Sequence, residues 1–157
     1  MIKLYLDHCC YNRPFDSQED AIIIAETNAK MFIQSLILYN VVEMAYSSVS
    51  LQENADNPFE ENRRSILAFI HENAKYYIAG ENNESAITMT EEIMRSGLKL
   101  KDAAHLACAI LAKCDYPITT DKRFLRHRDE RIKIVNPVDF VRFWEEMQWT
   151  AMRRPPR

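Results

Sequence analysis

Short continuous apolar runs alternate along this chain with longer segments in which apolar residues recur at helical spacing. The runs are IKLYL, LILY, KYYIA, YPITT and IKIV, at residues 2–6, 36–39, 75–79, 116–120 and 132–135. Apolar runs of this kind suit strands that are covered on both faces. Strands separated by helices require parallel crossover connections. The sequence therefore predicts an α/β fold, a three-layer α/β/α sandwich around a mostly parallel sheet of about five strands, with the first strand near the centre.

Helix signals fill the segments between these runs. Asp16 and Glu19 have the spacing of a capping box before AIIIAETNAKMFI. Pro58 follows Asn57 at a suitable first helical position, and Gly97 follows EEIMRS as a stop signal. The pattern supports helices on both sides of the predicted sheet.

The length of 157 residues suits one domain that buries a core without disulfides or a structural metal. We expect a single domain over residues 1–150 and a flexible basic tail over 151–157, because the terminal RRPPR can bury little. We find no apolar stretch of membrane-spanning length and no signal-peptide layout, which predicts a cytoplasmic protein without membrane contact. The four cysteines are then expected to be free thiols.

The scarcity of glycine excludes one class of site. With only 2 glycines the chain has no glycine-rich loop to cradle phosphates. The net charge of −3 provides no overall basic surface for nucleic acid, so such binding would need a local basic rim.

Acidic residues occupy the places where a parallel sheet gathers its functional groups. Asp7 follows the first run, Glu43 comes within a turn of the second, and Asp121 follows the fourth. Asp102 opens the alanine-rich helix that leads into the fourth run. In an open parallel sheet, ligands bind beyond the carboxyl ends of the strands, so these four acids are expected at one edge.

Each acid taken alone also has a structural explanation. Asp7 suits a turn at a strand end, and Glu43 could complete a capping box with Asn40. Asp102 could interact with a helix dipole in a first turn, and Asp121 could be an N-cap. The set is more informative than any member.

The segments LYLDHCCYNRPFD, YNVVEMA, KDAAHLACAI, ITTDKRF and IKIVNPVDF together resemble the PIN-domain family of metal-dependent nucleases over nearly the whole chain. The resemblance implies hydrolysis of phosphodiester bonds, usually in RNA, by an endoribonuclease such as the VapC-like toxins of toxin–antitoxin modules. It also implies a homodimer and a small antitoxin partner. The implied catalytic and metal-binding residues are Asp7, Glu43, Asp102 and Asp121, supported by Thr120 and Asn12.

Carboxylates suit this chemistry because Mg²⁺ and Mn²⁺ are hard ions that prefer oxygen ligands. A bound ion can orient and deprotonate a water, and a second ion can stabilise a leaving oxygen. Without an ion the clustered acids repel one another. The expected cofactor is therefore Mg²⁺ or Mn²⁺.

His8 keeps a second function class open. Members of the family often carry Thr or Ser directly after the first acid, whereas this chain has a histidine. The alternative is a catalytically weak PIN-like module that binds nucleic acid or protein. A third class, phosphoryl transfer with Asp7 as nucleophile, is disfavoured because Cys9 stands where a second Asp would be expected.

A zinc site made of His8, Cys9 and Cys10 is also disfavoured. The segment has no CxxC spacing, and neighbouring residues on an extended chain point in opposite directions. The cysteines are better explained as small core residues, and His105 as a packed, hydrogen-bonded histidine beside Asp102.

Basic residues cluster next to the acid motifs. A solvated face is the ordinary explanation, but their concentration beside the acids would suit a rim that contacts phosphates. Arg13 and Lys122 are the preferred substrate contacts. The full set is Arg13, Lys99, Lys101, Lys122, Arg123, Arg126 and Arg128.

Overall fold

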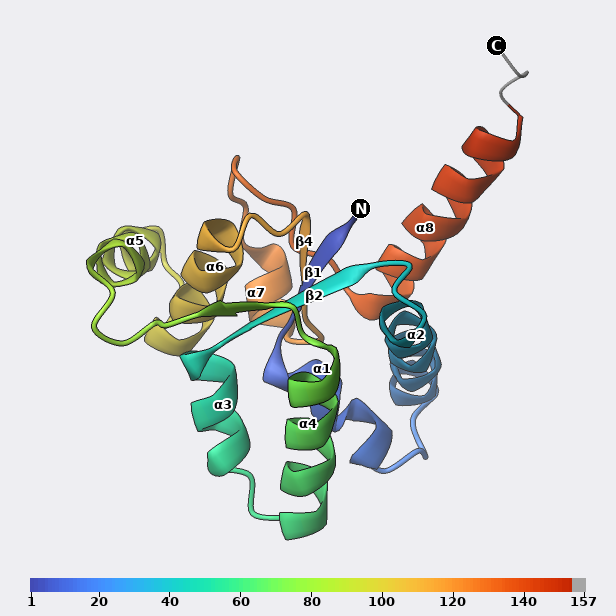
Figure 1. Ribbon diagram of the computed structural model, residues 1–157, viewed down its shortest axis with the longest axis horizontal. Coiled ribbons are helices and arrows are strands. Elements are labelled where there is room, and N and C mark those ends of the chain that lie inside the picture. Colours follow the sequence, from blue (N-terminus) through green and yellow to red (C-terminus); the bar gives the residue numbers. More distant parts are fainter. Residues whose placement is uncertain (154–157) are drawn as a thin grey trace.

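The computed structural model of the protein describes residues 1–153, and an all-parallel sheet lies at the centre of this part of the chain (Figure 1). The sheet has four strands in the order β3-β2-β1-β4, so the first strand lies inside the sheet as expected. The strands are β1 (Lys3–Leu6), β2 (Glu43–Ser47), β3 (Tyr76–Ile78) and β4 (Tyr116–Ile118). The predicted α/β class with a parallel sheet is confirmed, with four strands in place of about five.

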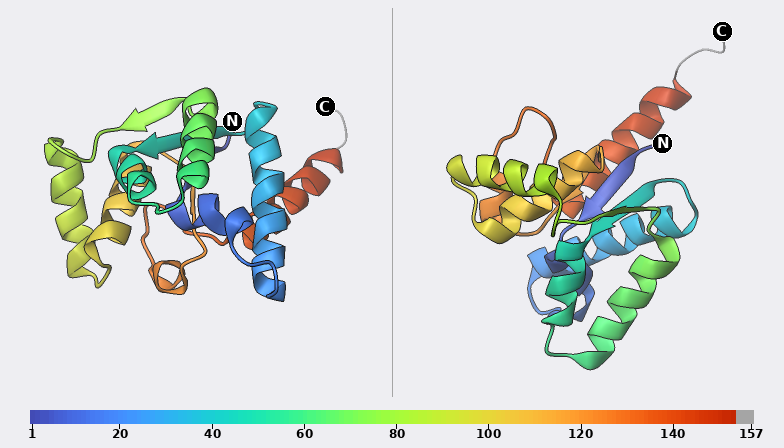
Figure 2. Two further views of the ribbon diagram at one scale, coloured as in Figure 1. Left: turned by 90° about the horizontal axis from the view of Figure 1, so that it is seen from below. Right: turned by 60° about the vertical axis from the view of Figure 1, so that its left-hand side comes forward.

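Helices cover both faces of the sheet (Figure 2). Because successive side chains of a strand point to opposite faces, Leu4 and Leu6 pack against α2, α4 and α8, whereas Tyr5 packs on the side of α6 and α7. This gives the three predicted layers. The helical elements are α1 (His8–Asn12), the 3₁₀ turn η1 (Arg13–Phe15), α2 (Ala21–Leu38), α3 (Ser48–Ala55), α4 (Glu60–Asn73), α5 (Glu84–Arg95), α6 (Leu100–Leu111), α7 (Lys122–Arg126) and α8 (Pro137–Met152).

Two predicted strands differ from the structure. Residues 36–39 form the end of α2, and the second strand instead begins at Glu43. The helix continues through this apolar run because Leu36 and Ile37 face the core, and the chain then turns at Asn40, whose φ is 54°. Residues 132–135 make only isolated bridges, a parallel one between Val135 and Ile118 and an antiparallel one between Ile132 and Asp129.

The helix α2 differs from the expectation that no apolar stretch of the chain has membrane-spanning length. By length and hydropathy alone it is long and apolar enough to cross a membrane. The same helix packs Ile33, Leu36 and Ile37 into the core beneath the sheet. Glu26 and Lys30 are also buried along it. A long apolar helix is thus used here to cover a sheet.

The end of α8 changes the expected domain boundary. The helix continues to Met152, so residues 151 and 152 belong to it and not to a tail. Arg153 is the C-cap of this helix, and residues 154–157 of the predicted basic tail lie outside the described residues.

Candidate metal-binding cleft

Asp7 is held firmly at the carboxyl end of β1. It is the N-cap of α1, where its Oδ1 accepts a 2.7 Å hydrogen bond from the backbone N–H of His8. Its Oδ2 accepts hydrogen bonds from the Thr119 hydroxyl at 2.7 Å and from the Cys9 thiol at 3.2 Å. These contacts fix a buried carboxylate at the mouth of the sheet. Asp7 therefore combines the turn role considered for it with a position suited to an ion.

Asp102 and Asp121 line the same cleft as Asp7, a hollow of about 450 Å³. Asp102 lies in the first turn of α6, and Asp121 is the N-cap of α7, accepting a 2.7 Å hydrogen bond from the N–H of Arg123. Burial and the nearby charges of Asp7 and Asp121 raise the pKa of the Asp102 carboxyl. Three of the four predicted acids thus converge, and their charges repel one another.

Glu43 does not join these acids, and its expected position is wrong. It begins β2 and is paired in register with Lys3, four residues before Asp7 along β1. At the rise of a strand, this places it roughly 13 Å from Asp7, at the opposite end of the sheet. There its carboxylate accepts a hydrogen bond from the Tyr76 hydroxyl at 2.9 Å and lies 3.6 Å from Lys75 Nζ. The error arose because residues 36–39 were interpreted as the preceding strand.

Glu53 supplies the fourth acid of the cleft. It comes from α3, which follows β2, so it reaches the carboxyl end of the sheet. A sequence signal for it exists: Ser47 and Ser50 have capping-box spacing and form that box at the start of α3. Glu53 lies three residues beyond Ser50 and so shares its face of the helix.

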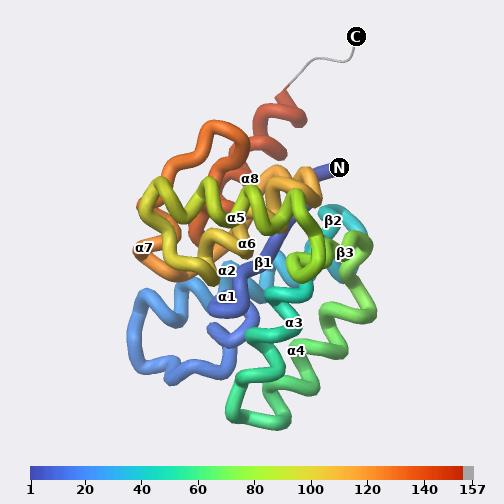
Figure 3. The backbone as a smooth tube through the Cα atoms, turned by 90° about the vertical axis from the view of Figure 1, so that its left-hand side faces the viewer, coloured from blue at the N-terminus to red at the C-terminus, as the bar shows by residue number. Residues whose placement is uncertain are grey.

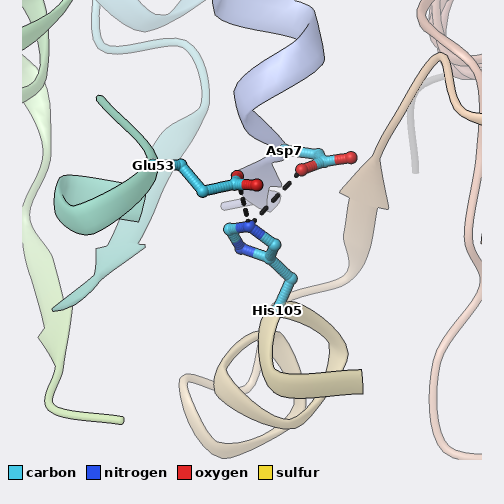
Figure 4. Close-up of side chains that lie close together, drawn as sticks. All are labelled: Asp7, Glu53 and His105. Atoms are coloured by element: carbon cyan, nitrogen blue, oxygen red, sulfur yellow. Dashed lines mark hydrogen bonds and ion pairs between the residues drawn. The ribbon is translucent and has the colours of Figure 1, made fainter. Parts of the chain in front are cut away.

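His105 connects the acids to the core, and Figure 4 shows its ring between Glu53 and Asp7. Its Nε2 lies 2.7 Å from Glu53 Oε2 and 3.5 Å from Asp7 Oδ1, and the three side chains offer ligand atoms within 4.8 Å of one another. Its Nδ1 lies 2.7 Å from the hydroxyl of Tyr5, which also contacts Ser47 at 2.6 Å. Since carboxylates only accept hydrogen bonds, Nε2 carries the proton.

The hydrogen bond between His105 and Glu53 shifts the pKa values of both side chains. Burial alone would lower the pKa of His105, but the hydrogen bond to Glu53 and the charge of Asp7 raise it above its ordinary value. Burial alone would raise the pKa of Glu53, but hydrogen bonds from His105 and Lys101 lower it. Glu53 is therefore held as a carboxylate whose orientation His105 fixes.

The predicted supporting residues are only partly where they were expected. Thr119, and not Thr120, donates to Asp7; Thr120 instead donates its backbone N–H to the sulfur of Cys9 at 3.3 Å. Asn12 lines the cleft and accepts a 2.8 Å hydrogen bond from the side chain of Asn57. The sequence does not distinguish Thr119 from Thr120, because a strand of three residues is too short to show which of the following side chains faces Asp7.

The basic residues at the cleft also differ from those predicted. Arg13 forms ion pairs with Asp16 and Glu26, both at 2.8 Å, and does not line the cleft. Lys122 is exposed on α7 outside the lining. Three other members of the proposed rim line the cleft, namely Lys99, Lys101 and Arg123. Lys101 Nζ lies 3.2 Å from Glu53.

The side chains of His8, Cys9 and Cys10 lie in three different environments. Cys9 faces Asp7, whereas Cys10 lies in the core and contacts the carbonyl of Ile118. All four cysteines are free thiols, as expected. His8 lines the cleft, only 9% exposed, and both of its ring nitrogens lack a hydrogen-bond partner. Burial lowers the pKa of His8, whereas the nearby carboxylates of Glu53 and Asp7 act in the opposite direction.

The fold is similar to that of chains in three solved structures. One is VapBC2 from Rickettsia felis bound to a DNA fragment from their promoter, with 15% identity over 86% of this chain and 98% of the other, and a TM-score of 0.59. Another is FitAcB from Neisseria gonorrhoeae, with 17% identity over 85% and 97% and a TM-score of 0.53. A third is FitAB bound to an IR36 DNA fragment, with 18% identity over 86% and 95% and a TM-score of 0.56.

No family model and no curated protein sequence matches the chain. At identities this low the structural similarity shows the fold alone. The PIN-like fold expected from the sequence is thereby confirmed.

Proposed function

From this PIN-like fold and its acidic cleft, we propose that the protein is a divalent-metal-dependent nuclease that hydrolyses phosphodiester bonds in RNA. The observation that carries the proposal is the convergence of Asp7, Glu53, Asp102 and Asp121 on one cleft. The acids come from four separate segments of the chain. We assign them as the metal-binding and catalytic residues, with Glu53 in the role first given to Glu43.

The donor set fits Mg²⁺ or Mn²⁺. All four side chains offer carboxylate oxygens, which hard ions prefer. Burial raises the pKa of Asp102 most, and the negative charges of Asp7 and Asp121 raise it further. The acids of the cleft therefore repel one another, and a bound cation would offset this repulsion. A bound ion would activate water and stabilise a leaving oxygen.

The chain's own residues would do the remaining work. Thr119 and the N–H of His8 hold the Asp7 carboxylate in place, and His105 holds that of Glu53. Lys99 and Arg123 line the same cleft and can contact the phosphates on either side of the scissile bond. Such positioning of substrate is a major part of phosphoryl-group chemistry.

The proposed partners follow from the resemblance and from exposed apolar surface. The similar structures are VapBC2 and FitAB, each bound to a DNA fragment, and they support an antitoxin partner for this chain. We also propose that the protein acts in the cytoplasm. We also propose a homodimer. α2 and α8 pack together and leave large apolar side chains exposed, among them Phe32, Leu38, Tyr39, Trp149 and Met152.

The alternative function is a PIN-like binding module with weak catalysis. It is favoured by His8, which stands where the family often has a hydroxyl and has no hydrogen-bond partner of its own. This module would bind nucleic acid or protein, and it differs from the nuclease proposal in predicting little or no hydrolysis.

Hydrolysis is tested by incubating the protein with a panel of RNAs in Mn²⁺, Mg²⁺ or chelator. We expect cleavage that chelator abolishes and that Asp102→Asn reduces by at least about a hundredfold. The matched control is Glu43→Gln, which should cleave as the wild type does. Cleavage that survives both chelator and Asp102→Asn would overturn the metal-nuclease proposal. Tight binding without any cleavage would favour the binding module.

A further inference from the structure

A second cavity adjoins the acidic cleft and shares part of its wall. Its volume is about 340 Å³, and His8, Asn12, Glu53 and Lys101 line both hollows. The cavity lies between α1, η1 and the turn that joins α3 to α4. Figure 3 shows these segments together at one end of the molecule.

Two exposed aromatic rings line the second cavity. Phe59 is 65% exposed and Phe15 is 48% exposed, although both are apolar. Phe59 stands just before α4 with its backbone N–H held by the side chain of Asn57 at 3.1 Å. Single-stranded RNA is recognised by stacking its splayed bases on rings of this kind.

His8 is a polar side chain of the cavity wall that lacks a hydrogen-bond partner. The side chain is more than nine-tenths buried, lines both hollows, and has no partner for either ring nitrogen. A neutral imidazole offers one donor and one acceptor, a combination that matches the edge of a base. The side chain of a lysine or arginine from a protein partner would match His8 less well, because it can donate hydrogen bonds but cannot accept one. A buried polar group without a partner is costly, which favours a ligand that completes it.

The charges around the cavity select the base over the phosphate. Asp16, Asp56 and Glu53 line it, and Lys101 is the cation among its lining residues. A phosphate would be repelled here, whereas in the neighbouring cleft Lys99, Arg123 and the proposed divalent cation would together offset the acids. The phosphate would therefore lie in the cleft and a neutral base in the cavity.

We propose that this cavity, lined by His8, Asn12, Asn57 and Phe59, binds one unpaired nucleobase of the RNA next to the cleaved bond and sets the nucleotide preference there. The proposal rests on the proposed nuclease function, because it needs RNA in the cleft. The volume falls within the range of small-ligand sites. The base would stack on Phe59 and exchange hydrogen bonds with His8.

The test measures binding separately from cleavage. Short single-stranded RNA homopolymers of A, C, G and U are titrated in Mn²⁺ against protein carrying Asp121→Asn, since Asn also caps a helix well and the variant should fold. The dissociation constants are measured by fluorescence anisotropy. In this background we expect the four homopolymers to bind with different affinities. Adding Phe59→Ala should weaken the preferred one by about 5- to 100-fold.

Matched variants separate recognition from folding. Tyr77→Ala removes a half-exposed ring from β3, outside both cavities and outside the proposed dimer surface, and should leave all four affinities unchanged. His8→Leu should make the four affinities more nearly equal, whereas His8→Gln, which keeps a donor and an acceptor, should retain a preference. The melting temperature of each variant shows that it is folded.

The outcomes are distinct. If Phe59→Ala and His8→Leu are folded and bind the homopolymers with unchanged affinity and preference, the base-pocket proposal is overturned while the nuclease proposal stands. If they keep RNA binding but lose a protein partner, this surface is a protein interface and the base-pocket proposal is overturned. If the protein neither binds nor cleaves RNA, both proposals fail.

Discussion

The Nε2 atom of His105 lies 2.7 Å from Oε2 of Glu53, and this contact joins α6 to α3 at the acidic cleft. The other ring nitrogen is held by Tyr5 from the central strand. One side chain therefore ties the orientation of a proposed metal ligand to the core of the sheet. A substitution at Tyr5 or His105 should therefore alter the position of the Glu53 carboxylate in the cleft.

The first prediction distinguishes the two glutamates. Mn²⁺ binding to the folded state should raise the melting temperature, with a stabilisation of about 2.7 kcal/mol at a hundredfold excess over the dissociation constant. Glu53→Gln should lose most of this rise because a hard ion depends on carboxylate charge. Glu43→Gln should keep it. Thermal unfolding with and without Mn²⁺ measures this rise in the two variants. A rise that is lost in Glu43→Gln and kept in Glu53→Gln would show that Glu43, and not Glu53, is the metal ligand.

The second prediction concerns the coupling between His105 and Tyr5. His105→Ala should lower the free energy of unfolding by about 1–3 kcal/mol, because it leaves a cavity and removes the partners of Tyr5 and Glu53. Tyr5→Phe should cost about 1 kcal/mol. Urea unfolding of the double variant should show less than the sum of the two losses. Strictly additive losses would mean that the two side chains act independently.

The third prediction is a pH dependence set by Lys30. Burial lowers the pKa of its ammonium from 10.5 to about 8, although its Nζ donates to Gln34 at 2.5 Å. Between these two pH values the unfolded chain binds more protons than the folded chain, so stability should rise as pH increases from about 8 toward 10.5. Below pH 8 the penalty is fully present, at most about 3 kcal/mol.

Replacing this residue tests the sign. Lys30→Met should stabilise the protein at pH 7 and flatten its stability between pH 8 and 10.5, as measured by urea unfolding across that range. Lys113→Met, at an exposed position, is the matched control and should change neither. A Lys30→Met protein with the wild-type pH profile would refute the assignment.

The fourth prediction concerns the phosphate contacts. Arg123→Ala should weaken RNA binding and reduce the salt dependence by about 0.7 in the slope of log affinity against log salt, the value for one contact to a single strand. Lys122→Ala should have little effect, since its side chain lies outside the cleft. Binding titrations at several salt concentrations compare these neighbours directly. A larger change for Lys122→Ala would restore the contact inferred from the sequence.

The fifth prediction is the oligomeric state. If the exposed apolar side chains of α2 and α8 form the homodimer interface, light scattering should give twice the mass of the chain at micromolar concentration. Tyr39→Glu combined with Trp149→Glu should shift the protein to a monomer, because both side chains are largely exposed in the single chain. A wild-type monomer at high micromolar concentration would argue against the interface.

Local sequence patterns are sufficient to predict the layered α/β fold, the central place of the first strand, and three of the four acids in the cleft. Asp7, Asp102 and Asp121 could be found because each stands directly at the boundary of an apolar run or helix, where local pattern is informative. The order of these elements then placed them at one edge of the sheet.

The fourth acid and the supporting contacts depend on tertiary packing. Whether Glu43 or Glu53 faces the cleft depends on which end of β2 each lies at, and that follows from where α2 stops. The apolar run at 36–39 suits a helix end or a strand equally well, and burial against the sheet selects the helix. The partners of His105 and the unpaired ring of His8 depend on contacts between segments far apart in the chain, which no local spacing encodes.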